Sequence, residues 1–150
     1  INYIPDQWAG HIAHESGLVD ESGWCPVDQR TFESKMHSGI HVIGDAAIAG
    51  AMPKSGLSAS SQAKFTAAAV IDMLNNKEPE TTTLANTCYS FLAPDYAISV
   101  AAVYTLSGNN IVKKNGSGGV SPSHAKHSVR REEAKYAQGW YDSITNDMFG

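Results

Sequence analysis

The first half of the chain contains one strand-like segment and one long helical segment, and this limits what it can fold into. Residues 40–43 are apolar apart from one histidine and end at Gly44-Asp45, which is typical of a short buried strand. Residues 58–76 have apolar side chains at helical spacing, with Ser58 as the expected N-cap. A single strand and a single helix cannot form a doubly wound sheet, so we expect residues 1–78 to be a fragment of a larger α/β unit.

The expected apolar stripe of that helix consists of Ala63, Ala67, Val70, Ile71 and Leu74. A second, shorter helix is expected over residues 5–17, because a proline suits its first turn and a glycine its end. Residues 20–34 are rich in Gly, Pro, Ser and Asp and are expected to form a loop.

The second half of the chain has a different texture, α+β in type. Residues 87–92 and 96–106 are rich in β-branched and aromatic side chains and predict strands. Residues 107–110 form a hairpin-turn sequence that leads into a further strand at 111–113. Residues 129–149 predict a helix, so this half is expected to be a small antiparallel sheet followed by a C-terminal helix. The expected apolar side of that helix consists of Ala137, Trp140, Tyr141, Ile144 and Met148.

Composition excludes several classes of protein. The 150 residues suit one ordinary domain or two small ones, and 42% apolar with 17% charged residues is a globular balance. A net charge of −4 without any Lys/Arg run argues against a nucleic-acid partner. The longest apolar runs fall far short of the roughly 18 residues of a membrane span. The chain begins at Ile1 without a methionine, and we expect it to be a piece of a longer protein.

Gly44-Asp45 is the first candidate site. An aspartate at the carboxyl end of a strand in an open α/β sheet lies where ligands bind, and its carboxylate can accept hydrogen bonds from sugar-like hydroxyls. The small residues that follow would let a cofactor approach the backbone, and the next helix would direct free N–H groups at an anionic group. The alternative is a capped turn with an exposed aspartate.

Other candidates each have a simpler interpretation. Cys88 could be a redox thiol or a small buried side chain, and with Cys25 it forms no CxxC pair. Trp140 could stack near a flat cofactor or fill the core. Lys54 could be a surface lysine or a charge near a bound group. The pairs His11/His14 and His124/His127 are incomplete as metal ligand sets, so no metal site is predicted.

Longer stretches of the sequence resemble a known family. These are HVIGDAAIAGAMPKSGLSASSQAK, NTCYSFLAPDYAISVAAVY, GWCPVDQRTFESKMHSGIHVIGDA and the ending REEAKYAQGWYDSITNDMFG. They resemble the C-terminal portion of the flavoprotein subunit of flavocytochrome c sulfide dehydrogenase, a relative of glutathione reductase. The resemblance covers nearly the whole chain, without the N-terminal GxGxxG half of that family.

The resemblance implies an oxidoreductase that binds FAD. In this family, sulfide is oxidised at a redox disulfide beside the flavin, and electrons pass singly to a c-type cytochrome subunit. Cys88 matches one cysteine of that disulfide, whose partner lies outside this sequence. Asp45, with Gly44 before it, matches the acid that holds the ribityl chain, and Trp140 matches an aromatic residue near the flavin. The turn expected to face the flavin consists of Met52, Pro53, Lys54, Ser55 and Gly56.

The same resemblance implies a domain division and a location. Residues 1–78 would be the second segment of the FAD domain, and residues 79–150 the C-terminal flavin-binding and interface domain. Family members are exported, so a periplasmic location is implied. The missing N-terminal part of the same chain would be a partner of this fragment, and the fragment alone is expected to be inactive.

Two other functions remain open at this point. The first is a fragment of a sulfide:quinone oxidoreductase, although the mixed charges of the C-terminal helix do not suit membrane docking. The second is a non-catalytic module that binds or dimerises. Apolar surface left uncovered by missing strands would favour such a homo-oligomer.

Overall fold

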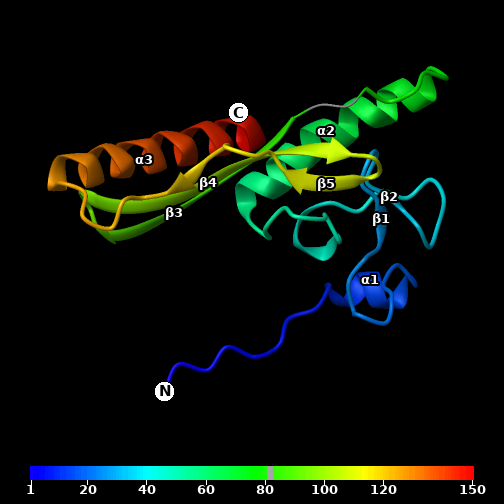
Figure 1. The fold of residues 1–150 in the computed structure, drawn as a ribbon. Coiled ribbons are helices and arrows are strands. Elements are labelled where there is room, and N and C mark those ends of the chain that lie inside the picture. The colour runs from blue at the N-terminus through cyan, green and yellow to red at the C-terminus, as the bar shows by residue number, and fades with distance from the viewer. Residues whose placement is uncertain (81–82) are drawn as a thin grey trace.

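The computed structural model describes residues 1–80 and 83–150 and contains short N-terminal elements followed by a sheet flanked by two long helices (Figure 1). In chain order the elements are α1 (His11–Glu15), β1 (Val27–Asp28), β2 (Glu33–Ser34), the 3-10 helix η1 (Gly44–Ala46), α2 (Gly56–Leu74), β3 (Leu84–Ala93), β4 (Tyr96–Ser107), β5 (Asn110–Lys113), β6 (Gly119–Val120) and α3 (His127–Phe149). None of the helices in these residues is both long and apolar enough to span a bilayer.

The main sheet is antiparallel and is built around β4. β3 pairs along one edge of β4, and β5 and then β6 pair along the other. The turn at Ser107–Asn110 closes the β4–β5 hairpin, and Gly108 adopts the left-handed φ of 60° that this turn requires. α3 lies along the β3–β4 ribbon, and α2 lies against the other end of β3 (Figure 1). The predicted small antiparallel sheet with a C-terminal helix is therefore confirmed.

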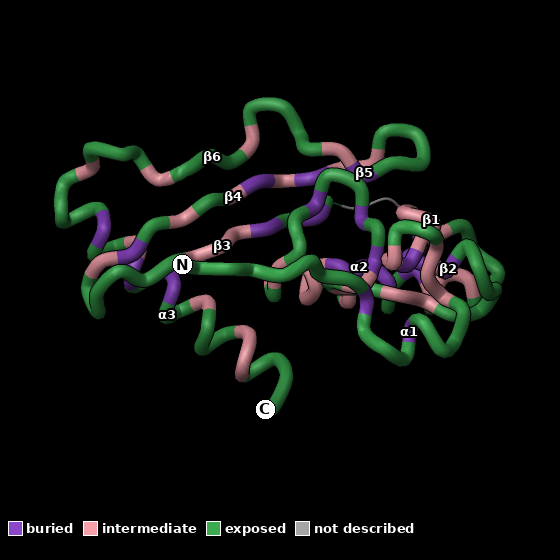
Figure 2. The backbone as a smooth tube through the Cα atoms, turned by 90° about the horizontal axis from the view of Figure 1, so that it is seen from below, coloured by how far each residue is buried: buried purple, intermediate pink, exposed green. Residues whose placement is uncertain are grey.

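One hydrophobic core joins the two halves of the chain. Phe32 from the N-terminal loops packs edge-on against Phe65 of α2, with ring centroids 6.0 Å apart. Leu84, Tyr104 and Ile111 from the sheet complete the same cluster. In Figure 2 the buried backbone concentrates where β3, β4 and β5 approach α2. This core thus contains residues from both sides of the predicted domain boundary after residue 78.

The strand predicted at residues 40–43 is wrong. His41 forms one isolated bridge to Glu33, and no ladder continues from it. Ile43 is extended, with φ −126° and ψ 173°, but it is exposed, as is Ile40. The physical reason is that an apolar strand needs neighbours on both edges, and the described residues pair this segment on one edge only, where Ser34 N–H donates to the Ile40 carbonyl and Val42 N–H to the Phe32 carbonyl. Residues 40–43 thus have the apolar pattern of a buried strand but are not part of a sheet.

Two helix predictions need correction at their starts. The helix predicted at residues 5–17 is only α1, because residues 5–10 have no regular structure. Short helices are marginal without packing, and Trp8 in this stretch is exposed. In α2 the N-cap is Ser55, whose hydroxyl accepts the Ser58 N–H at 3.2 Å, so Ser58 is not the cap.

The predicted inward faces of the long helices are also only partly right. α2 buries a more polar face, made by Ser58, Gln62, Phe65, Thr66 and Ala69. Ile71 and Leu74 of the predicted stripe are exposed, Leu74 at 78%. On α3, Ala137 is buried, whereas Tyr141 and Met148 face solvent.

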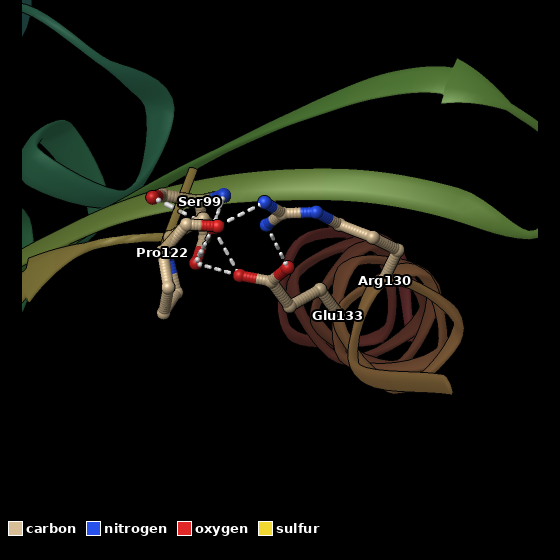
Figure 3. A network of polar contacts seen from close by, with 5 residues as sticks. Ser99, Pro122, Arg130 and Glu133 are labelled. Atoms are coloured by element: carbon tan, nitrogen blue, oxygen red, sulfur yellow. Dashed lines mark hydrogen bonds and ion pairs between the residues drawn. The ribbon is translucent and has the colours of Figure 1, made fainter. Parts of the chain in front are cut away.

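A polar network fastens α3 to the sheet (Figure 3). Glu133 accepts hydrogen bonds from Ser99 of β4 at 3.0 Å, from Ser121, and from Arg130 at 2.8 Å. Arg130 also donates to the carbonyl of Pro122. The Arg130 side chain is 3% exposed and that of Glu133 13%, so this is a buried ion pair with several hydrogen bonds. It holds the segment after β6 between the helix and the strand.

Candidate functional site

The turn at Met52–Lys54 forms one wall of a pocket of about 190 Å³. The Gly44–Asp45 turn forms another wall, and Ser58 and Gln62 from the buried face of α2 also line the pocket. The lining residues are Trp24, Gly44, Asp45, Ala47, Ile48, Ala49, Gly50, Met52, Pro53, Lys54, Ser58 and Gln62. Five residues predicted from the sequence are therefore gathered here, namely Gly44, Asp45, Met52, Pro53 and Lys54.

Gln62 connects the two walls of this pocket. Its Oε1 accepts the N–H of Gly44 at 2.7 Å, and its Nε2 lies 3.7 Å from the sulfur of Met52. Gly44 has φ 72°, which a glycine adopts without strain, so the turn can place Asp45 at the pocket edge. The Asp45 side chain is exposed, and its carboxylate is free to accept hydrogen bonds from a ligand.

Lys54 folds back over the pocket. Its Nζ lies 3.6 Å from the centroid of the Trp24 ring and donates to the carbonyls of Asp45 and Ala47. Burial lowers the pKa of Lys54 from its ordinary value, and the nearby charge of Asp45 opposes that effect. The cation–π contact and the two carbonyls hold a positive charge beside the Asp45 carboxylate.

The start of α2 lies next to this pocket and offers donors to it. Ser55 is the cap and Gly56 the first helical residue, so the unpaired N–H groups of the first turn begin here. Ser58 is 1% exposed and lines the pocket, and its hydroxyl oxygen has no hydrogen-bond partner among the described residues. A buried hydroxyl without a partner is costly, which indicates that a ligand group belongs beside it.

Trp140 reaches the same region from α3. A Cβ built on Gly56 would lie 3.7 Å from the Trp140 ring, an ordinary contact distance, so the ring lies beside the first residue of α2. The ring also lies 6.3 Å from that of Tyr89 in β3. Its indole N–H is buried and has no acceptor in the part of the chain described. Trp140 is thus placed at the start of α2, and the pocket under the Met52–Lys54 turn is lined by other residues.

Cys88 lies on the other side of the same turn. It is half-buried in β3 and is a free thiol, as is the buried Cys25. A second pocket, of about 250 Å³, is lined by Cys88, Asn86, Val100, Ala101, Ala102, Tyr104, Lys113, Ala51 and Pro53. Pro53 lines both pockets, so the Asp45 and Cys88 sites adjoin each other across one turn.

These features fit part of a flavin nucleotide. The Asp45 carboxylate suits ribityl hydroxyls, and the start of α2 with the Lys54 charge suits an anionic group. The unpartnered hydroxyl of Ser58 adds a donor within the pocket. A volume near 190 Å³ is below the roughly 300 Å³ at which ligand pockets begin, so these residues line only one section of such a cofactor.

Sequence patterns missed several residues of these sites. Trp24, Ser58 and Gln62 line the first pocket, and Asn86 lies beside Cys88 in the second. Ser58 and Gln62 are four residues apart and share one helix face, and Asn86 and Cys88 are two apart in a strand, so both pairings could have been inferred. No pattern indicates Trp24. Within residues 1–80 and 83–150, no group of three or more His, Cys, Asp or Glu side chains could hold a metal ion.

Comparison with known protein families identifies the second half of the chain. Residues 80–149 match the family model described as flavocytochrome c sulphide dehydrogenase, flavin-binding. This match confirms the resemblance inferred from the sequence and confirms FAD as the cofactor. The name of that family also refers to a cytochrome. Residues 80–149 are therefore similar to the flavin-binding domain of flavocytochrome c sulfide dehydrogenase, a family of oxidoreductase flavoprotein subunits.

Proposed function

We propose that this chain is the C-terminal part of a FAD-dependent sulfide dehydrogenase that passes electrons to a c-type cytochrome. The observation that carries this proposal is the arrangement at Pro53, where a pocket edged by Asp45 adjoins a pocket containing the Cys88 thiol. The family match over residues 80–149 supports the same assignment. In this proposal the pocket at Asp45 holds the cofactor and the pocket at Cys88 receives sulfide.

The residues around the first pocket would bind and orient the cofactor. Asp45 would accept hydrogen bonds from ribityl hydroxyls, and Ser58 would complete its hydrogen bonding with the bound group. The start of α2 and the Lys54 ammonium would favour negative charge on the ligand. When bound, FAD supplies the chemistry that accepts two electrons together and releases them one at a time.

Cys88 would act as one half of a redox disulfide whose other cysteine lies outside this sequence. Hydrosulfide attacks one sulfur of that disulfide, so a new S–S bond forms as the old one breaks. The displaced cysteine leaves as a thiolate that carries the electron pair, and its position beside the cofactor lets that pair move on. Cys25 is a poor candidate for the second cysteine because it is fully buried in a different cluster.

The test is a Cys88→Ser variant of the complete protein, compared with Cys25→Ala. We expect Cys88→Ser to retain its flavin but to lose bleaching of the flavin absorbance by sulfide, since it removes only the sulfur. Cys25→Ala should bleach at the normal rate. Normal bleaching in Cys88→Ser would refute the role given to Cys88.

A second measurement separates cytochrome reduction from quinone reduction. The exposed charges of α3 are paired and mixed, with Lys135 2.7 Å from Glu132 and Arg131 3.5 Å from Asp95, which does not suit an anionic membrane surface. The complete protein should therefore reduce a c-type cytochrome faster than a soluble quinone. The resemblance to an exported family also predicts that it fractionates with the periplasm. Preferential reduction of quinone would favour the sulfide:quinone oxidoreductase alternative.

A further inference from the structure

The Asn86 side chain is within hydrogen-bonding distance of the Cys88 sulfur. The two residues are two positions apart in β3, so they lie on the same face of the sheet, away from α3. Asn86 is 3% exposed, and its Nδ2 lies 3.4 Å from Sγ of Cys88. A second contact, from Sγ to Oδ1, is longer at 3.9 Å. The buried amide N–H is therefore directed at the sulfur.

The orientation of this amide is set by the cap of α2. Ser55 Oγ accepts the Ser58 N–H at 3.2 Å and lies 2.5 Å from Oδ1 of Asn86. The Ser55 hydroxyl donates its proton to Oδ1, which accepts but cannot donate. That bond leaves Nδ2 on the side of Cys88. A continuous chain of hydrogen bonds thus runs from the first turn of α2 to the sulfur.

We propose that Asn86 is a positioning residue for Cys88, which fixes its side chain and stabilises its thiolate through the Nδ2–H donor. A thiolate accepts hydrogen bonds and a thiol is a poor acceptor, so the donor favours the ionised form. The catalytic meaning of this role rests on the proposed function. The effect of Asn86 on the Cys88 sulfur does not rest on the proposed function, because it depends only on the contact between the two side chains.

Other groups around the sulfur are few. Tyr104 of β4 and Lys113 of β5 are the titratable residues that line the Cys88 pocket with it. Burial raises the pKa of Tyr104, and the charge of Cys88 adds to that shift, which favours the neutral phenol. Lys113 is exposed and its charge is screened by solvent. Asn86 is the buried donor among these neighbours.

The test measures the alkylation rate of Cys88 by iodoacetamide against pH in the 150-residue chain, whose two cysteines are Cys25 and Cys88. Asn86→Leu keeps the size of the side chain but removes the donor. Loss of a hydrogen bond to a charged group should lower the rate about tenfold below the titration midpoint and move that midpoint up by about one pH unit. The matched control is Thr87→Val, a polar-to-apolar change at the neighbouring position on the opposite sheet face. The Cys88→Ser variant measures the background alkylation of Cys25.

An Asn86→Leu profile that coincides with that of Thr87→Val would overturn the proposal. If Asn86→Leu does not fold, the Ser55→Ala variant tests the proposal instead. It keeps Asn86 but removes the donor that orients the amide, so the midpoint should move in the same direction by a smaller amount. An unmoved midpoint in Ser55→Ala then counts against the proposal. Alkylation needs neither flavin nor sulfide, so this result is independent of whether Cys88→Ser loses sulfide-dependent bleaching.

Discussion

The buried ion pair between α3 and the sheet gives the sharpest stability prediction. In Glu133→Gln the new amide can still accept the hydroxyl hydrogen bonds of Ser99 and Ser121, but its neutral end faces the Arg130 guanidinium. Breaking a buried pair from one side typically costs 3–5 kcal/mol, because the other charge remains buried without compensation. Arg130 still donates a hydrogen bond to the Pro122 carbonyl, so we expect a loss of unfolding free energy at the low end of this range, about 3 kcal/mol.

The assay is urea unfolding followed by far-UV circular dichroism, with Glu132→Gln as the matched control. Glu132 is the preceding residue of the same helix and pairs with Lys135 at 2.7 Å, but both side chains are more than half exposed. Exposed pairs of this kind contribute about 0–1 kcal/mol, so the control should stay near the parent protein. If Glu133→Gln unfolded at the same urea concentration as Glu132→Gln, the network would contribute no more than a surface pair.

The same network predicts a dependence on pH. Burial raises the pKa of Glu133, but hydrogen bonds from Ser121, Arg130 and Ser99 outweigh it and hold the pKa below the ordinary value of 4.5. A carboxyl group whose pKa is lowered by folding stabilises the native state above its unfolded pKa, and this contribution is lost as pH falls through the folded value. The parent protein should therefore lose unfolding free energy below about pH 4.5 more steeply than Glu133→Gln. Parallel curves would refute this.

Two further predictions concern packing and are checked by the same urea assay. Phe32→Ala should cost about 3–5 kcal/mol, because a fully buried ring that packs on Phe65 is replaced by a cavity; a loss below 1 kcal/mol would mean that the core collapses around it. Gly118→Ala should cost about 2 kcal/mol more than Gly116→Ala, because a Cβ at 118 would lie 2.0 Å from the carbonyl oxygen of Ala101, whereas both glycines share a left-handed φ. Equal losses would show that β6 can move away without cost.

The sheet and the last helix could be predicted because their signals are local. Strand propensity, a hairpin turn around Gly108 and a helical period over residues 129–149 act within short segments and agree with one another. The strand at residues 40–43 failed for the opposite reason. Its apolar run depends on neighbouring strands that no local pattern supplies, and without them the segment is extended and partly exposed.

The candidate site was predicted in outline only. The turn from Met52 to Lys54 and the Gly44-Asp45 turn do line one pocket, since both flank the same helix start. Gln62 and Asn86 were missed because their importance comes from contacts across the fold, with Gly44 and with Ser55. The inward face of α2 was misjudged because it is lined by polar side chains that hydrogen-bond, and a hydrophobic period cannot detect these.

The shared position of Pro53 has a consequence for how this protein can vary. A single residue forms the partition between the pocket edged by Asp45 and the pocket that contains Cys88. The proline ring restricts its own backbone, so this partition is stiff and the spacing between the two chambers is set by covalent geometry. A smaller side chain at position 53 would open the two pockets toward each other, so a substitution there changes both at once.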